Sequence, residues 1–284
     1  MTDTLAPPAP APASPPRERA RPEGPLAASR LARALGLGAR RCAAVAAFAL
    51  LWEVAPRLGL VDRVFLPPLS EVLATLASLT LDGQMGEHVS ASLGRGLTGF
   101  LAAVAAAVPL GVLLAWYRPV YDLLSPLLEL FRNTAALALL PVFVLVLGIG
   151  ETSKIALVIY ACTFPVLLNT VTGVRTVDPL LVKSAVSLGF SPVGVFTKVV
   201  LPAALPSVFT GIRLAGASSL LVLIAAEMVG ARSGLGYLVN SAQLNFQIPH
   251  MYAGIIAIAV VGLLLNQVLV SLERRFSRWR PSRS

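Results

Sequence analysis

Long apolar segments dominate this chain, and each of them is long enough to cross a lipid bilayer. A helix needs about 20 consecutive apolar residues to span the hydrocarbon core. Six windows of this kind occur in the 284 residues, at about 42–61, 95–116, 127–149, 155–174, 206–229 and 252–272. Only 13% of the residues are charged, which is about half of the fraction in a soluble domain. The pattern predicts an all-α integral membrane protein with about six transmembrane helices.

Lysine and arginine are distributed unevenly between the two sides of the predicted spans. With a cytoplasmic N-terminus, sixteen of the 23 basic residues lie on the cytoplasmic side and five on the outer side, including Arg95 and Lys154. Basic residues favour the cytoplasmic side, so we expect both termini to be cytoplasmic, in a bacterial inner membrane. We expect residues 1–40 to form a disordered tail, 41–275 the transmembrane domain and 276–284 a basic tail.

A moderately polar segment, residues 178–202, interrupts the apolar pattern between the fourth and fifth predicted spans. Asp178-Pro179 and Ser191-Pro192 each supply an N-cap followed by proline at the first helical position. Gly189 is placed to end the first helix, and Pro202 is expected to end the second. Each predicted helix has about ten residues, or about 15 Å, which is half of a bilayer. Neither helix can span, so we expect a docking surface at the cytoplasmic face.

This segment carries a spaced motif, which consists of Lys183-Ser184-Ala185, Gly189, Val199 and Leu201-Pro202. The motif resembles the cytoplasmic coupling loop of permease subunits of binding-protein-dependent ABC importers, whose pattern is Glu-Ala-Ala, three residues, Gly, nine residues, Ile-x-Leu-Pro. Ser184 and Val199 are mild substitutions, and Lys183 reverses the charge of the family's acidic residue. The resemblance implies that these seven residues couple the chain to a separate ATPase.

Four further segments extend the resemblance over roughly residues 60–280, and they are typical of the sulfonate, nitrate and taurine branch of these permeases. They are residues 138–141, 148–154, 226–228 and 233–238. The resemblance implies the architecture of a type I ABC importer permease and a path for a small solute, an anion such as an aliphatic sulfonate, taurine or nitrate. It also implies three protein partners, namely an ABC ATPase subunit, an extracytoplasmic solute-binding protein and a second copy of the chain in a homodimer.

The sequence lacks the motifs of several other kinds of site. None of its three lysines follows a glycine with the spacing of a phosphate-binding loop, so we expect ATP to act through the partner and no cofactor to bind this chain. His88 and His250 show no metal-ligand spacing, and Cys42 and Cys162 each stand alone. The basic residues flank the apolar block, which suits anionic lipid better than nucleic acid. We expect no catalytic residue, no metal site and no nucleic-acid partner.

Three polar residues within the predicted spans are candidates for the translocation path. A charge at the centre of a span costs about 2.5–3.5 kcal/mol on insertion scales, so each needs a reason. Arg132 and Asn133 either present hydrogen-bond donors to an anionic substrate, or Arg132 is neutralised by Glu129 on the same helix face. Glu227, near the outer end of the fifth span, either caps backbone donors of the following loop or closes a gate.

Other classes of membrane protein fit the sequence less well. A secondary transporter driven by an ion gradient is the alternative function, but it should show paired polar interruptions in corresponding halves of the chain, and we find no convincing internal repeat. A membrane-embedded enzyme needs convergent His, Asp or Glu residues at one depth. A structural anchor has no use for two capped helices at the membrane surface.

Overall fold

The computed structural model describes residues 43–276 of the chain. In this range the secondary structure is helical throughout, without a β-strand, so the predicted all-α class is confirmed. Contacts divide the chain into two units, one that ends at Leu51 and one that begins at Trp52. The described part of the first unit is the start of a helix over residues 43–57. All of the packing described below lies within the second unit.

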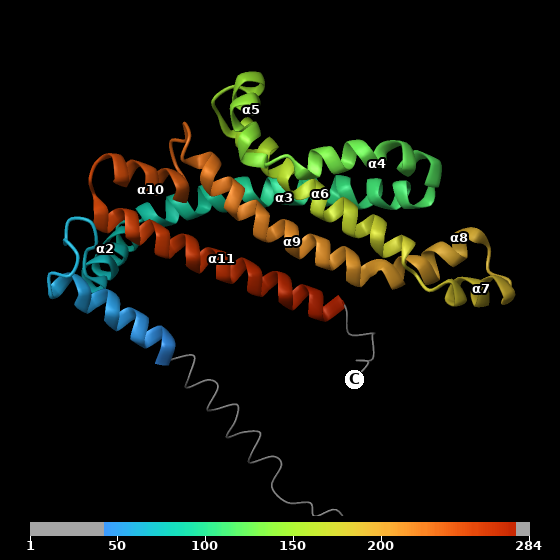
Figure 1. The fold of residues 1–284 in the computed structure, drawn as a ribbon, viewed down its shortest axis with the longest axis horizontal. Helices are drawn as coiled ribbons and strands as arrows, with labels where there is room; N and C mark the ends of the chain where they lie inside the picture. The colour runs from blue at the N-terminus through green and yellow to red at the C-terminus, as the bar shows by residue number, and fades with distance from the viewer. Residues whose placement is uncertain (1–42, 277–284) are drawn as a thin grey trace, which may run out of the picture. The chain divides into compact units, whose positions relative to one another are not determined.

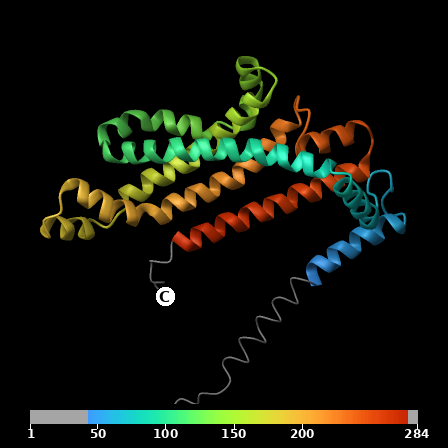
Figure 2. The same cartoon turned by 180° about the vertical axis from the view of Figure 1, so that it is seen from behind.

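Four long helices and several short ones make up the second unit (Figure 1). The long helices are α3 (Gln84–Trp116), α6 (Glu151–Arg175), α9 (Leu201–Glu227) and α11 (Ile248–Phe276). The short elements are α2 (Leu69–Leu81), α4 (Arg118–Asn133), η1 (Ala136–Leu139), α5 (Leu140–Leu147), α7 (Pro179–Ser187), α8 (Pro192–Val195), η2 (Phe196–Val200) and α10 (Leu235–Leu244). α7 and α8 lie at one end of the long helices, and α2 and α10 lie at the other, in both views (Figures 1 and 2).

Glycines bring α3, α6 and α9 into close contact. A Cβ added at Gly99 or Gly111 of α3 would lie 2.8 Å from a side chain of α6, and one added at Gly211 of α9 would lie 2.7 Å from Asn169 of α6. Such close approach is how helices associate in lipid, where packing replaces the hydrophobic drive. The buried core around these contacts includes Ala103, Ala107, Val158, Cys162, Val166 and Ala215.

Four described helices are long and apolar enough to cross a membrane, namely α3, α6, α11 and the continuous helix Pro192–Glu227 that contains α9. They cover the predicted spans 95–116, 155–174 and 252–272 completely and nearly all of 206–229, and they extend beyond most of the predicted limits. The predicted span 42–61 is helical over 43–57. Residues before 43 lie outside the described part, so whether this segment spans stays a prediction.

The predicted span over 127–149 is made of two helices with a sharp bend between them. α4 and the helix over residues 136–147 that follows it are bent by 87° at a short break. Pro141 has no N–H to donate to the carbonyl of Leu137, and the hydroxyl of Thr134 donates to the carbonyl of Leu130 at 3.0 Å, so the helix is weakened on both sides of the break. The hydroxyl of Tyr160 on α6 donates to the carbonyl of Phe131 at 2.8 Å and satisfies an acceptor near the break.

The prediction that Pro202 ends the second short helix is wrong. α8, η2 and α9 form one continuous helix from Pro192 to Glu227. η2 is a π-helical turn in which the N–H of Leu201 donates to the carbonyl of Phe196, five residues back. This wider turn makes room where the ring of Pro202 would otherwise clash with the preceding turn. The segment that follows α7 is therefore the first part of a spanning helix.

The close contact between α6 and α9 can be tested by adding one methyl group. In Gly211→Ala the new Cβ meets Asn169 and the backbone carbonyl of Pro165, and overpacking of this kind costs about 1–3 kcal/mol. We expect a lower midpoint of thermal unfolding in detergent, followed by size-exclusion chromatography of heated samples. Gly94→Ala is the matched control, because a Cβ at this helical position meets nothing within 4 Å. Equal midpoints for the two variants would contradict the packing.

Candidate functional site

The polar segment after α6 folds locally as its capping residues predict. The carboxylate of Asp178 accepts from the N–H of Leu180 at 2.8 Å and caps α7. Gly189 has a positive φ of 81° and follows the end of α7, where Phe190 N–H donates to the carbonyl of Ala185 at 3.2 Å. The hydroxyl of Ser191 accepts from Gly194 N–H at 3.2 Å and caps the next helix.

Three of the seven motif residues lie on α7, Gly189 follows α7, Val199 lies in η2, and Leu201 and Pro202 begin α9. Ala185 is buried, Lys183 and Ser184 are exposed, Val199 and Leu201 are half-buried, and Gly189 and Pro202 are exposed. Large apolar side chains around them are exposed as well, namely Leu180, Leu181, Val186, Leu188 and Val193. A capped helix with exposed apolar side chains at the end of the bundle is suited to fit a cleft in another protein.

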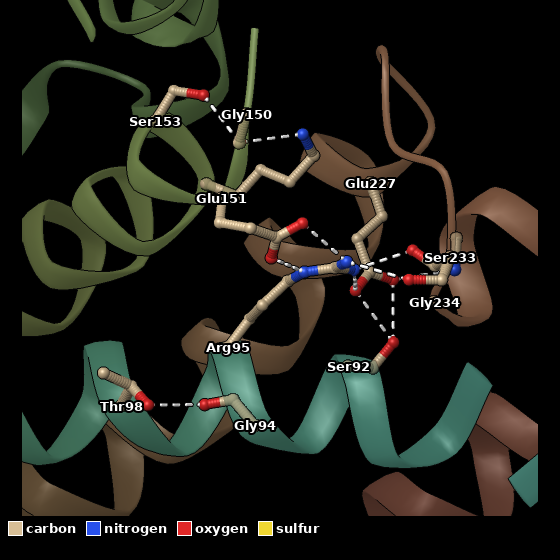
Figure 3. A network of polar contacts seen from close by, with 12 residues as sticks. Ser92, Gly94, Arg95, Thr98, Gly150, Glu151, Ser153, Glu227, Ser233 and Gly234 are labelled. Atoms are coloured by element: carbon tan, nitrogen blue, oxygen red, sulfur yellow. Dashed lines mark hydrogen bonds and ion pairs between the residues drawn. The ribbon is translucent and has the colours of Figure 1, made fainter. Parts of the chain in front are cut away.

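A charged cluster joins three helices at the opposite end of the long helices (Figure 3). Arg95 of α3 pairs with Glu151, the first residue of α6, and its Nη1 lies 2.7 Å from Oε1 of Glu227, the last residue of α9. The same guanidinium donates to the carbonyl of Ser233 at 2.7 Å. Lys154 is also buried here and donates to the carbonyl of Gly150 at 3.0 Å. Two cations and two anions thus balance each other in one site.

Glu227 caps the loop that follows it. Its side chain is fully buried and accepts from the hydroxyl of Ser92 at 2.8 Å and from the N–H of Gly236 at 3.0 Å. Gly234 and Gly236 lie so close to Glu227 that a Cβ at either position would overlap its side chain. The capping role of Glu227 is therefore confirmed, and it is combined with an ion pair to Arg95. Whether this site closes a gate stays a prediction.

Sequence reasoning missed Arg95, Glu151 and Lys154 as members of this cluster. Arg95 and Lys154 were placed on the outer surface, but their side chains are only 7% and 2% exposed. Arg95 is followed on α3 by 21 uncharged residues, 96–116, and this is the signal that could have identified the site, because an ionisable residue in a span needs a partner. The segments 148–154, 226–228 and 233–238, quoted for the family resemblance, all contribute residues to the cluster.

α4 presents three different faces. The first packs on the core through Tyr121, Leu124 and Leu128. The second exposes large apolar side chains, which are Val120, Leu123, Leu127 and Leu130. The third is polar and consists of Arg118, Asp122, Ser125, Glu129 and Arg132, whose spacing places them on one side of the helix. We refer to these five residues as the α4 polar stripe, and Asn133 lies beside its end.

Two contacts fix the depth of the α4 polar stripe along α6. The guanidinium of Arg175, at the end of α6, lies 3.9 Å over the ring of Tyr121, and Tyr160 bonds to Phe131 as described above. Along α6, Tyr160 is about 14 Å from Glu151 and about 22 Å from Arg175. Phe131, and with it the neighbouring Arg132, therefore lies part-way along α6 and away from both of its ends.

Arg132, Asn133 and Glu129 are exposed in the single chain, and their side chains have no hydrogen bond or ion pair to any residue between 43 and 276. The Glu129–Arg132 ion pair that neutralisation requires is thus absent from the described part of the chain. Glu227 lies at the charged cluster and is not brought together with Arg132 and Asn133, because the cluster is about nine residues of α6 away from Tyr160. The three predicted path residues therefore lie at two separate sites. Arg132 and Asn133 are at the end of α4, and Glu227 is in the charged cluster.

The charged cluster should be essential for stability. Removal of one partner from a buried ion pair costs about 3–5 kcal/mol, because the other charge stays buried and unpaired. We expect Arg95→Gln to lower the thermal unfolding midpoint in detergent strongly. Arg213→Gln is the matched control, since the Arg213–Glu273 pair is partly exposed and such pairs contribute about 0–1 kcal/mol. Equal losses in the two variants would contradict the buried, balanced cluster.

Comparison with known proteins agrees with this geometry. Residues 107–279 match the family described as "Binding-protein-dependent transport system inner membrane component". The chain is 36% identical to the taurine transport system permease protein TauC of Escherichia coli (strain K12) over 81% of this chain and 85% of that protein. It is 37% identical to the putative aliphatic sulfonates transport permease protein SsuC of Bacillus subtilis (strain 168), over 82% and 84% of the two chains.

The fold is similar to a chain of the MetNI methionine ABC transporter, solved in inward-facing conformations. The TM-score is 0.60 at 18% identity, and the match covers 67% of this chain and 95% of that one. This likeness supports the fold of the bundle. Permeases of this family act with an ATPase subunit and a solute-binding protein. The chain belongs to the family of inner-membrane components of binding-protein-dependent transport systems and is a membrane-spanning permease of an ABC importer.

Proposed function

We propose that two copies of this chain enclose a solute path lined by the α4 polar stripe, and that the solute is a small anion of the sulfonate class. The observation that carries this proposal is that Glu129 and Arg132 are exposed and without partners in the described chain, at a position part-way along α6. We place this position near the middle of the bilayer, because α6 is long enough to span it. The family assignment implies two further components of the transporter, an ATPase and a binding protein. ATP acts through that ATPase, and this chain contributes no covalent chemistry.

The three faces of α4 support a water-filled path. A charged side chain that faces lipid at mid-depth costs several kcal/mol, whereas the exposed apolar face of α4, with Leu123 at 76% exposure, suits lipid or a protein partner. Because the polar and the lipid-compatible residues are segregated on different sides of one helix, the polar side faces water or another protein. A second copy related by a two-fold axis places its own stripe across the path.

The break between α4 and α5 also supports a path at this depth. Interrupted helices are tolerated within a membrane where they line a cavity or are covered by protein, and they frequently mark binding sites in transporters. Arg132 and Asn133 form the last turn of α4, immediately before this break. A guanidinium binds a tetrahedral oxyanion through two parallel hydrogen bonds, which fits the taurine and sulfonate named for the similar permeases.

The surface of α7 is proposed as the place where the ATPase binds. The exposed apolar side chains of α7 and the motif residues from Lys183 to Pro202 lie at one end of the bundle, and the α4 polar stripe begins near that end, where Tyr121 meets Arg175. This end is then cytoplasmic, as the distribution of basic residues predicts. Both termini are cytoplasmic in this arrangement, and the membrane is the bacterial inner membrane.

Cysteine accessibility tests whether the α4 polar stripe faces water. The starting protein carries Cys42→Ser and Cys162→Ala. Ser125→Cys should react quickly with a charged methanethiosulfonate in membrane vesicles, because thiolate forms only where water is present. Leu123→Cys, which is on the apolar face and is more exposed in the single chain, should react at least about tenfold more slowly. Faster reaction at position 123 would contradict a watered path along the stripe.

A proline substitution tests the coupling surface. Gly189 needs its positive φ of 81°, which proline cannot adopt. When the chain is co-expressed with ABC ATPase subunits from the same genome, we expect the parent to retain an ATPase through purification and Gly189→Pro to lose it. Gly59→Pro is the matched control, because Gly59 has a similar φ of 73° but precedes α2 at the other end of the bundle. If the parent retains no ATPase, or if both variants lose it, this surface is not the coupling site.

A further inference from the structure

Glu129 and Arg132 carry opposite charges on one face of α4, and neither charge is satisfied within the described part of the chain. Residues three apart on a helix differ by about 4.5 Å along its axis. The carboxylate of Glu129 therefore lies about one turn closer to the cytoplasmic end than the guanidinium of Arg132. The other charged groups of the same face, Asp122 and Arg118, lie two or more turns further toward that end.

In a dimer with a two-fold axis along the membrane normal, each of these residues lies at the same depth in both copies, and the two equivalent side chains form a layer across the path. Each residue of one stripe faces the same residue of the other copy at the same depth. The path then holds a layer of two guanidinium groups from Arg132 and, below it, a layer of two carboxylates from Glu129. Like charges that face each other across a path repel and stay available to a solute of opposite charge.

A simple anion is bound by the first layer and repelled by the second. An anion on its way to the cytoplasm would leave Arg132 and enter the field of two carboxylates, whose effect is large because few other charges are near. A solute with both an acidic group and an amine fits both layers at once. A two-carbon linker between these groups has about the length of the 4.5 Å rise between the layers.

We propose that Glu129 is a specificity-determining residue of the path, and that it binds the ammonium group of a small zwitterion whose acidic group binds Arg132 and Asn133. This inference rests on the proposed solute path, and it narrows the sulfonate class to amino-sulfonates. The role differs from that of a structural charge. A structural Glu129 would affect every solute equally, whereas a recognition residue changes the ratio between solutes with and without the amine.

The test measures this ratio on the full-length chain in lipid nanodiscs, without a binding protein that could impose its own preference. Taurine and 1-propanesulfonate are the probes, since they have the same length and differ by an ammonium in place of a methyl group. Ligand-observed NMR titration gives the two dissociation constants. We expect the parent to bind taurine about tenfold more tightly than propanesulfonate, because the ammonium group of taurine forms one additional charge-assisted hydrogen bond, to Glu129.

Three variants separate the roles of the two layers. Glu129→Gln should bring the two dissociation constants within about twofold of each other, by weakening the binding of taurine alone. Arg132→Gln should weaken both probes. Glu71→Gln, the same change at an exposed carboxylate of α2 outside the stripe, should leave the ratio unchanged and is the matched control. Size-exclusion profiles identical to that of the parent show that each variant is folded.

The possible results distinguish this inference from the function on which it rests. If the parent binds neither probe, the proposed sulfonate path is wrong. If the parent binds both probes equally, the path stands and the zwitterion site is overturned. The zwitterion site is also overturned if Glu129→Gln weakens both probes by the same factor, or if Glu71→Gln removes the preference as fully as Glu129→Gln does.

Discussion

The unfavourable free energy of placing a charged side chain in hydrocarbon is the main constraint on this structure. The chain meets that cost in two different ways. At one end of the long helices, Arg95, Lys154 and Glu227 are buried, the exposed Glu151 pairs with Arg95, and backbone groups complete the hydrogen bonds. On α4, Glu129 and Arg132 have no partner in the described chain. The first arrangement is satisfied internally and holds three helices together, whereas the second is complete only when water, a solute or a second copy covers it.

The continuous helix from Pro192 to Glu227 connects the two ends of the bundle. It begins beside α7, where we place the ATPase, and ends at the buried carboxylate that caps the loop before α10. Since the π-turn at η2 carries the helix past Pro202 without a break, one continuous helix leads from the segment after α7 to the charged cluster. α6 runs alongside it, with Glu151 at the same cluster and Arg175 near the start of α4. The proposed coupling surface is therefore joined to the charged cluster by two packed helices.

Much of this fold could be predicted from the sequence, because the relevant signals are local. Apolar windows located the long helices, and Asp178, Gly189 and Ser191 predicted the caps and the turn of the coupling segment correctly. The errors came where the outcome depends on neighbours in space. The break after Asn133 depends on the hydroxyl of Tyr160 of α6 as well as on Pro141. The helix through Pro202 depends on a π-turn that no short sequence motif predicts.

The charged cluster shows the same limit for the site. Its members lie far apart along the chain, and Arg95 is 132 residues from Glu227. A count of basic residues places Arg95 and Lys154 in outer loops, because it cannot tell a solvated arginine from a paired one. Arg132 and Asn133 could be proposed from sequence as path residues, but their depth and their lack of partners are visible only after α4 is placed against Tyr160.

In the proposed dimer, the α4 polar stripes of two copies face each other across the path. The distance between nitroxide labels on the two copies tests this arrangement directly, and it is obtained by double electron–electron resonance in nanodiscs with Cys42 and Cys162 replaced. We expect labels at Ser125→Cys to be closer together than labels at Leu123→Cys, which lies on the apolar face of the same helix. Labels that are closer at position 123, or no dipolar coupling at position 125, would contradict it.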